Sequence, residues 1–131
     1  MDVRLDGKCA LITGGSRGIG LAIAKKFADS GADVAILSRS REKLDQAKAD
    51  IAKTAKVRVA AIECNVAERA SLERGYAQAL DALGKIDILV NNAGSSQRGN
   101  FLELTDERWQ SDFDLKVFGA IRFSRLAIPG M

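Results

Sequence analysis

Hydrophobic positions along this chain form four short continuous runs, and each run is followed by a longer stretch with apolar residues at helical spacing. Only two of the runs contain a charged residue, Arg58 in the third and Asp87 in the fourth. Short apolar runs of this kind suit strands that are buried on both faces. We therefore predict strands at residues 10–12, 34–37, 57–62 and 86–90.

The stretches that follow the runs predict four helices. Apolar residues three or four positions apart share one face of a helix, and glycine commonly follows the last turn. Gly31 and Gly84 are expected to end the first and third helices, and Thr105 or Asp106 to cap the fourth. The predicted buried stripes are Ile19, Ile23 and Phe27; Leu44, Ala47 and Ile51; Leu72, Tyr76, Leu80 and Leu83; and Trp109, Phe113, Val117 and Ile121.

The alternation of strands and helices predicts the fold class. Parallel strands joined by right-handed helical crossovers form a sheet with helices on both faces. We therefore expect an α/β fold, a Rossmann-type doubly wound parallel sheet, with the strands in the order third, second, first, fourth. The length suits a single nucleotide-binding domain over residues 1–131.

A glycine-rich turn between the first strand and the first helix predicts a phosphate site, because the first N–H groups of a helix are unpaired and attract anions. Gly14 suits a tight turn, Gly18 lets a pyrophosphate approach the backbone, and Gly20 lets the helix pack closely. The turn lacks the Gly-Lys-Ser/Thr ending of a nucleoside triphosphate loop. It comprises Thr13-Gly14-Gly15-Ser16-Arg17-Gly18-Ile19-Gly20.

A second motif, Asn91-Asn92-Ala93-Gly94, directly follows the fourth strand. Ligands of doubly wound sheets bind beyond the carboxyl ends of the strands, at the point where the strand order reverses. Here that point lies between the first and fourth strands. The spacing Thr-Gly-x-x-x-Gly-x-Gly followed by Asn-Asn-Ala-Gly resembles the short-chain dehydrogenase/reductase family, and the resemblance covers residues 7–131.

The resemblance implies a nicotinamide dinucleotide cofactor, and charge favours NADP(H) over NAD(H). An NAD site presents a carboxylate to the ribose after the second strand, whereas this chain has Ser38-Arg39, and the planar guanidinium suits a 2′-phosphate. Arg17 resembles a second basic position of NADP(H)-binding relatives. The expected cofactor contacts are Gly14, Ser16, Arg17, Gly18, Ile19, Gly20, Ser38, Arg39, Asn65, Val66, Asn91, Ala93 and Gly94.

Asn65-Val66 resembles the family's Asp-Val, in which the acid contacts the adenine amino group. Asparagine keeps an acceptor oxygen but loses the charge, so we expect Asn65 to contact adenine. Lys116 stands where family members usually place an asparagine that holds a water of the proton relay. Either the relay is arranged differently here or Lys116 points away from the site.

The catalytic residues that the resemblance implies are a serine and a tyrosine whose pKa is lowered by a lysine four residues later. The chain has no Tyr-x-x-x-Lys, and its single tyrosine, Tyr76, is expected in the core. The resemblance therefore implies an N-terminal half, truncated after the fourth helix and inactive alone. The whole enzyme would interconvert a small-molecule carbonyl and an alcohol by hydride transfer, with a 3-oxoacyl thioester as one candidate substrate.

Two other functional classes remain open. A non-catalytic relative could bind the dinucleotide as a sensor or scaffold, in agreement with Lys116 and the missing tyrosine. A methyltransferase shares the parallel sheet and a glycine loop, but it would need an acidic residue after the second strand, where this chain has Ser38-Arg39.

Composition and charge indicate where the protein is expected and which ligands it is not expected to bind. Hydrophobic residues make up 47% and charged residues 28% of the chain, which are values typical of globular domains. The sequence contains no signal-peptide core and no apolar run of membrane length, so a cytoplasmic location is expected. The net charge of +3 comes from interleaved charges, which disfavours nucleic acid. With no histidine and two separated cysteines, we expect no metal site. An apolar fourth helix and an open sheet edge predict a homo-oligomer.

Overall fold

The computed structural model describes residues 2–95 and 98–131 and confirms the predicted doubly wound architecture. Four parallel strands form one sheet in the order β3-β2-β1-β4, as expected from the sequence. In the regions predicted as strands, the structure places β1 at Cys9–Thr13, β2 at Asp33–Ser38, β3 at Val59–Glu63 and β4 at Ile88–Val90. β3 and β4 each begin two residues later than predicted, and β3 ends one residue later.

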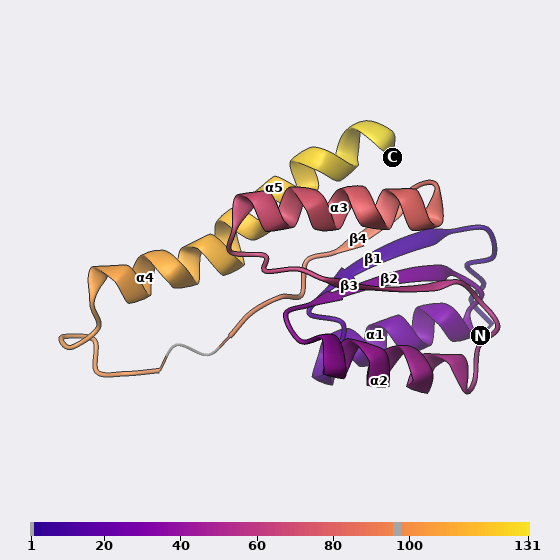
Figure 1. The fold of residues 1–131 in the computed structure, drawn as a ribbon, viewed down its shortest axis with the longest axis horizontal. Helices are drawn as coiled ribbons and strands as arrows, with labels where there is room; N and C mark the ends of the chain where they lie inside the picture. The colour runs from indigo at the N-terminus through magenta and orange to yellow at the C-terminus, as the bar shows by residue number, and fades with distance from the viewer. Residues whose placement is uncertain (1, 96–97) are drawn as a thin grey trace.

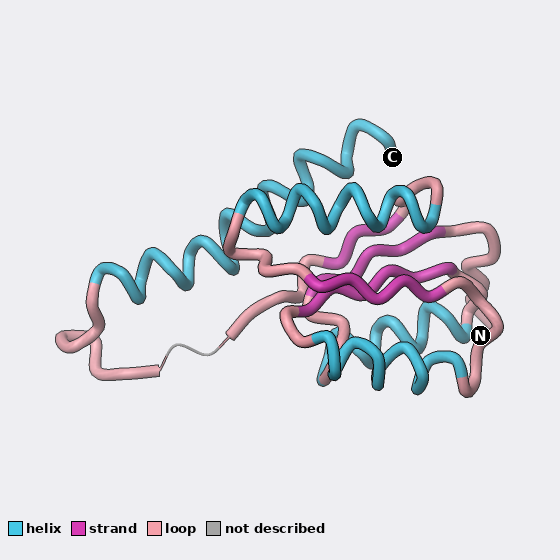
Figure 2. Tube along the Cα trace, in the orientation of Figure 1, coloured by secondary structure: helices cyan, strands magenta, loops and turns pink. Residues whose placement is uncertain are grey.

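Helices cover both faces of the sheet (Figures 1 and 2). α1 (Gly18–Asp29) and α2 (Arg41–Ala52) pack on one face, and α3 (Arg69–Leu83) and α5 (Gly119–Ala127) on the other. Successive side chains of a strand point to opposite faces. Ala10 and Ile12 of β1 therefore join the core beneath α1 and α2, whereas Cys9 and Leu11 join the core beneath α3 and α5.

The face that α1 buries differs from the predicted stripe, whereas α3 buries the predicted Leu72 and Leu83 and departs from its stripe at Leu80. In α1 the buried residues are Gly20, Ala24 and Ala28, while Ile19 is 74% exposed. In α3 the buried residues are Leu72, Gly75, Ala79 and Leu83. Leu80, which we predicted in the core, is exposed. Small residues let a helix backbone approach a sheet closely, so the glycine and alanine positions face inward.

The predicted fourth helix is divided into three parts: α4 (Asp106–Phe113), a π-helical turn η1 (Asp114–Phe118) and α5. A π turn contains more residues than an α turn and rotates the faces of the flanking helices relative to each other. The residues of the predicted core stripe, Trp109, Phe113, Val117 and Ile121, are 40–46% exposed. The buried residues of α5 are instead Gly119, Phe123 and Ala127.

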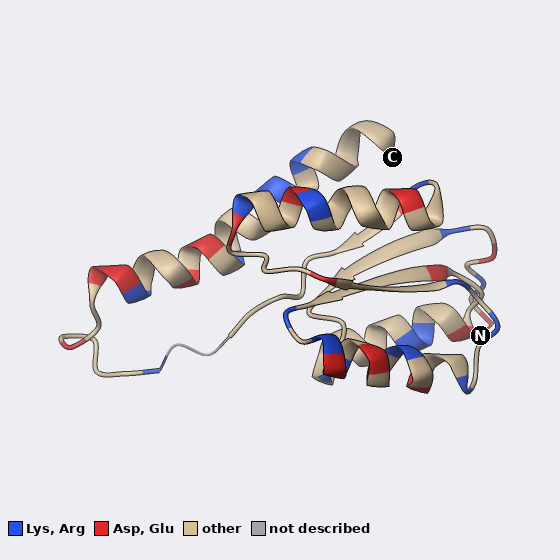
Figure 3. Cartoon of the chain, viewed as in Figure 1, with Lys and Arg blue, Asp and Glu red and all other residues tan. Residues whose placement is uncertain are grey.

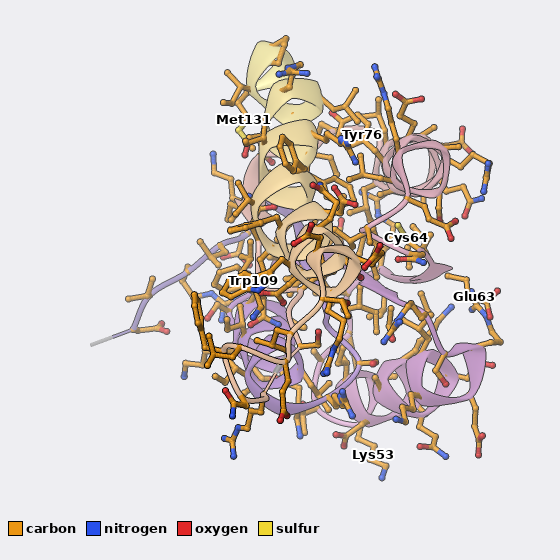
Figure 4. The ribbon with its side chains drawn as sticks, turned by 90° about the vertical axis from the view of Figure 1, so that its left-hand side faces the viewer. Lys53, Glu63, Cys64, Tyr76, Trp109 and Met131 are labelled. Carbon is orange, nitrogen blue, oxygen red and sulfur yellow. The ribbon has the colours of Figure 1, made fainter. Side chains whose placement is uncertain are left out.

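α4 extends beyond the end of the sheet (Figure 1), and Trp109 points away from α3 (Figure 4). We name the exposed residues Trp109, Phe113, Val117 and Ile121 the outer stripe. Trp109 has its ring centroid 6.1 Å from those of Phe101 and Phe113. The outer stripe is thus a continuous apolar surface that the described part of the chain leaves uncovered.

β4 pairs only with β1 among the described residues, so its other edge is open. Asp87 lies just before it and accepts a hydrogen bond from the Cys9 backbone N–H at 2.9 Å. That bond and the Lys85 ammonium hold the pKa of the Asp87 carboxyl below its usual value.

Charged residues elsewhere lie mainly on helices and loops (Figure 3). No helix among the described residues has the length and apolar character needed to cross a membrane.

Candidate functional site

The glycine loop connects β1 to α1 at the carboxyl end of the sheet. Gly14 and Gly18 have φ values of +65° and +56°, which favour glycine because they lie in the left-handed region. α1 begins at Gly18 with no side-chain cap on its N-terminus and no acidic residue in its first turn. The first N–H groups of α1 and the positive end of its dipole are therefore free to receive an anion.

Gly20 has a packing role beside the loop. A Cβ atom at this position would collide with the carbonyl oxygen of Gly14 and with the side-chain amide of Asn92. Gly20 is fully covered by these groups and is not among the residues that line the cavity described below. Its glycine identity is needed because the first turn of α1 rests directly on the loop backbone.

Thr13 joins the two sequence motifs. Its hydroxyl accepts hydrogen bonds from the backbone N–H groups of Asn92, at 3.0 Å, and Ala93, at 2.9 Å. The same hydroxyl donates to the carbonyl of Val90 at 3.4 Å. Asn92 adds a bond from Nδ2 to the carbonyl of Gly14, at 3.2 Å. The end of β4 is thereby fixed against the glycine loop, where the strand order reverses.

Replacing Thr13 with valine is expected to lower the free energy of unfolding by about 1–3 kcal/mol, because two backbone N–H groups lose their acceptor in a partly buried position. Urea unfolding monitored by circular dichroism measures the change. Thr13→Ser is the matched control, since it keeps the hydroxyl and removes only a methyl group. Equal destabilisation by both substitutions would contradict the role given to the hydroxyl.

A cavity of about 680 Å³ opens over the carboxyl ends of the four strands. No aspartate or glutamate is among the described residues that line it. The lining residues are Gly14, Ser16, Arg17, Gly18 and Ile19 of the loop; Leu37, Ser38, Arg39, Ser40 and Lys43 around the end of β2; Cys64, Asn65, Val66 and Ala67 after β3; and Asn92, Ala93, Gly94, Ser95, Ser111 and Leu115.

Three cations line this cavity: Arg17, Arg39 and Lys43. The guanidinium and ammonium groups of these side chains have no hydrogen-bonding or ionic partner among the described residues. Arg41, by contrast, donates to the carbonyl of Ala61 at 3.1 Å from both terminal nitrogens and does not line the cavity. The arrangement is suited to an anion with several negative charges, because unpaired cations and no carboxylates surround the space.

Lys43 was not among the predicted site residues. We could have found it from the sequence, because Ser40 is a favourable N-cap and places residue 43 in the first turn of α2. The Ser40 hydroxyl indeed accepts the Lys43 backbone N–H at 3.3 Å. Ser16 donates to the Ser38 hydroxyl at 2.9 Å and joins the glycine loop to the end of β2.

Asn65 and Val66 lie immediately after β3, next to Glu63 and Cys64, which mark the end of that strand in Figure 4. The Oδ1 atom of Asn65 accepts the backbone N–H of Ala67 at 3.1 Å. Burial raises the pKa of the Cys64 thiol, so it stays protonated at neutral pH. One of the two lone pairs of Asn65 Oδ1, the expected acceptor for adenine, is used within the chain.

Two of the predicted contacts do not line the cavity. Gly20 packs as described, and Asn91 is exposed, with Nδ2 donating to the hydroxyl of Ser124 in α5 at 3.3 Å. Asn92, the next residue, lines the cavity instead. Neighbouring residues at a strand end point in opposite directions, and the sequence did not establish which of the two asparagines faces the ligand.

Lys116 lies in η1 and turns toward its own helix. Its Nζ is 3.0 Å from Oδ1 of Asp112 and donates to Oδ2 at 3.3 Å. The side-chain stem passes close to Gly94, but Lys116 does not line the cavity. Of the two alternatives left by the sequence, this geometry favours the one in which the ammonium points away. Tyr76 of α3 is partly buried and packs against the core on the side of α5 (Figure 4).

Comparison with known proteins places the chain among reductases and dehydrogenases. The family model described as short chain dehydrogenase matches residues 8–131. The chain is 41% identical to a sorbitol dehydrogenase of Cereibacter sphaeroides over 91% of this chain and 45% of that protein. It is 34% identical to a 3-oxoacyl-[acyl-carrier-protein] reductase of Aquifex aeolicus over 100% of this chain and 53% of that protein.

Among solved structures, L-sorbose reductase from Gluconobacter frateurii, complexed with NADPH and L-sorbose, superimposes with a TM-score of 0.95 and 38% identity. The superposition covers 100% of this chain and 50% of the reductase. The chain thus spans about half the length of the relatives that it matches.

Proposed function

Because this chain belongs to the short-chain dehydrogenase family, we propose that it forms the NADP(H)-binding part of an oxidoreductase that interconverts a carbonyl and an alcohol. The observation that carries the proposal is the cavity over the strand ends, with the glycine loop at its centre, three unpaired cations around it and no carboxylate in its described lining. The cofactor, when bound, supplies or accepts the hydride.

The residues present fit a phosphorylated dinucleotide. The uncapped start of α1 suits the pyrophosphate, and the end of β2 is the place where such folds hold the ribose 2′ group. There the chain presents Ser38, Arg39 and Lys43. NADPH is also the cofactor in the superimposed L-sorbose reductase. We expect a small-molecule carbonyl or alcohol as substrate, as the names of the sorbose, sorbitol and 3-oxoacyl relatives suggest.

Titration with the two reduced cofactors tests the proposal. NADPH is expected to bind about ten- to a hundredfold more tightly than NADH, because hydrogen bonds to a charged phosphate contribute about 1.5–3 kcal/mol. Isothermal titration calorimetry at constant ionic strength measures both dissociation constants. Equal affinities would remove the role proposed for the three cations, and the absence of binding by either cofactor would contradict the proposal as a whole.

We further expect the 131-residue chain to oxidise no NADPH with ketose or 3-oxoacyl substrates, because it holds no Tyr-x-x-x-Lys to donate the proton. We also expect it to self-associate, through the outer stripe or the open edge of β4. Sedimentation velocity measures the association, and turnover is followed by NADPH absorbance. Val117→Glu should abolish association through the outer stripe, whereas Leu102→Glu, in an exposed loop, should not.

Association that survives Val117→Glu would assign the contact to the β4 edge. A wild-type chain that sediments as a monomer at micromolar concentration would contradict the prediction of a homo-oligomer. Measurable turnover would contradict the prediction that the 131-residue chain is inactive for lack of a proton donor.

A dinucleotide-binding sensor or scaffold is the second candidate function. It is favoured by the ion pair between Lys116 and Asp112, which turns the ammonium away from the cavity. A protein containing this chain that binds NADPH but reduces no carbonyl, even with a Tyr-x-x-x-Lys present, would establish the second function over the first.

A further inference from the structure

The charged groups of the three cations around the cavity, Arg17, Arg39 and Lys43, are held by no other part of the described chain. All three residues are exposed, and no hydrogen bond or ion pair fixes their guanidinium or ammonium groups among the described residues. Long side chains without partners keep most of their rotamer freedom. Their charges can therefore follow an anion over several positions in the cavity.

The cations enter the cavity from two sides. Arg17 belongs to the glycine loop that leads into α1, whereas Arg39 and Lys43 follow β2, with Lys43 in the first turn of α2. In folds of this kind the pyrophosphate lies at the start of α1 and the ribose at the end of β2. The ribose of a bound adenosine nucleotide is therefore expected between Arg17 and the other two cations. Its 2′ and 3′ hydroxyls are on neighbouring carbons, so a phosphate on either one is within reach of these side chains.

Discrimination between a 2′- and a 3′-phosphate needs a group that penalises one of them. The described lining contains no carboxylate that could repel a phosphate or hold one ribose hydroxyl. The Ser38 hydroxyl accepts bonds from the Ser16 hydroxyl at 2.9 Å and from the Ser40 N–H at 3.4 Å. The Ser40 hydroxyl accepts the Lys43 N–H. Both hydroxyls keep their own proton to donate, and a donor suits a phosphate oxygen at either position.

Resting on the proposed function, we infer that the cavity also binds adenosine 5′-diphosphates that carry a 3′-phosphate, the nucleotide end of coenzyme A, so that coenzyme A competes with NADPH. The nucleotide ends of the two molecules are isomers with the same charges, and they differ only in which ribose hydroxyl is phosphorylated. Mobile cations respond to the charge of the ligand and little to this difference. The fraction of the chain that holds NADPH is then set by the ratio of the two nucleotides.

The test uses the 131-residue chain and three nucleotides without nicotinamide: adenosine 2′,5′-bisphosphate, adenosine 3′,5′-bisphosphate and adenosine 5′-monophosphate. Calorimetry at constant ionic strength measures the three dissociation constants. We define the 2′ ratio and the 3′ ratio as the constant of the monophosphate divided by that of each bisphosphate. Each ratio isolates one phosphate, because adenine and the 5′-phosphate are shared. Coenzyme A is then titrated into the chain in the presence of NADPH.

We expect both ratios to be about fivefold or more, because each added phosphate gains charge-assisted hydrogen bonds to the cations. Coenzyme A should displace NADPH. The double substitution Arg39→Met with Lys43→Met removes two of the three cations and should lower both ratios. The control, Arg41→Met with Lys48→Met, removes the same charge from the same segment at positions outside the cavity lining and should leave both ratios unchanged.

A 3′ ratio below about fivefold beside a 2′ ratio above it would overturn this inference and leave the proposed function intact. Both ratios below that value would overturn the proposed NADP(H) site, and this inference with it. A 3′ ratio that the control lowers as much as Arg39→Met with Lys43→Met would show a general charge effect and overturn the inference. NADPH that coenzyme A fails to displace would likewise contradict the competition.

Discussion

Replacing Arg39 with aspartate is expected to reverse the cofactor preference, with NADPH affinity falling by at least about a hundredfold, because a phosphate contact of about 1.5–3 kcal/mol is lost and a like charge is introduced. NADH affinity should rise, since the new carboxylate can accept hydrogen bonds from the ribose hydroxyls. Arg39 lines the cavity at the end of β2 and has no partner within the described chain that would otherwise occupy it. Calorimetry with both cofactors measures the reversal.

Arg41→Asp is the matched control for this substitution. It changes the same charge two residues later, but the Arg41 guanidinium is held by the Ala61 carbonyl and by Asp45, 3.3 Å away, and lies outside the cavity lining. The order of cofactor affinities should therefore survive it. A similar loss of NADPH affinity in both variants would indicate a general field effect, and unchanged affinities in Arg39→Asp would refute the phosphate contact.

Gly20→Ala is expected to lower both stability and cofactor binding. The added methyl group collides with the backbone carbonyl of Gly14, which cannot move without displacing the loop. Overpacking of this kind lowers the free energy of unfolding by about 1–3 kcal/mol. Displacement of the loop should also lower NADPH affinity by about a hundredfold, because hydrogen bonds to the charged pyrophosphate contribute about 1.5–3 kcal/mol each.

Gly130→Ala is the control, because a Cβ atom there meets no other atom within 4 Å and the backbone is not left-handed. Urea unfolding and NADPH titration are measured for both variants. An unfolding free energy for Gly20→Ala equal to that of the wild-type chain would show that the first turn of α1 can move away from the loop, and the packing role of Gly20 would then be wrong.

The sequence by itself determined the order and class of the elements. Four apolar runs predicted four strands, and their alternation with helical stretches fixed a parallel sheet, because crossovers of this length permit little else. The glycine loop and Asn91-Asn92-Ala93-Gly94 placed the candidate site at the reversal of strand order. These features depend on local backbone preferences and on periodicity, which are properties of neighbouring residues.

The sequence was less informative about which side of each helix faces inward. Ile19 and Leu80 belong to apolar stripes and yet are exposed, because α1 approaches the sheet through glycine and alanine, and α3 through Gly75 and Ala79 between Leu72 and Leu83. The outer stripe of α4, η1 and α5 was also predicted in the core but is exposed. The direction in which its two halves face relative to each other depends on the π turn at Asp114–Phe118, and no local sequence pattern predicted that turn.

At the site, only the tertiary structure decided how individual polar groups are used. Arg39 and Arg41 both follow β2, and the carbonyl of Ala61 accepts from Arg41 but leaves the guanidinium of Arg39, the arginine predicted to contact the cofactor, without a partner among the described residues. Oδ1 of Asn65, the expected acceptor for adenine, also accepts the Ala67 N–H, which fixes the orientation of the side-chain amide. Hydrogen bonds are directional and each group has few of them. The chemistry that a side chain offers a ligand is therefore what remains after its neighbours have bound it, and those neighbours are set by the fold.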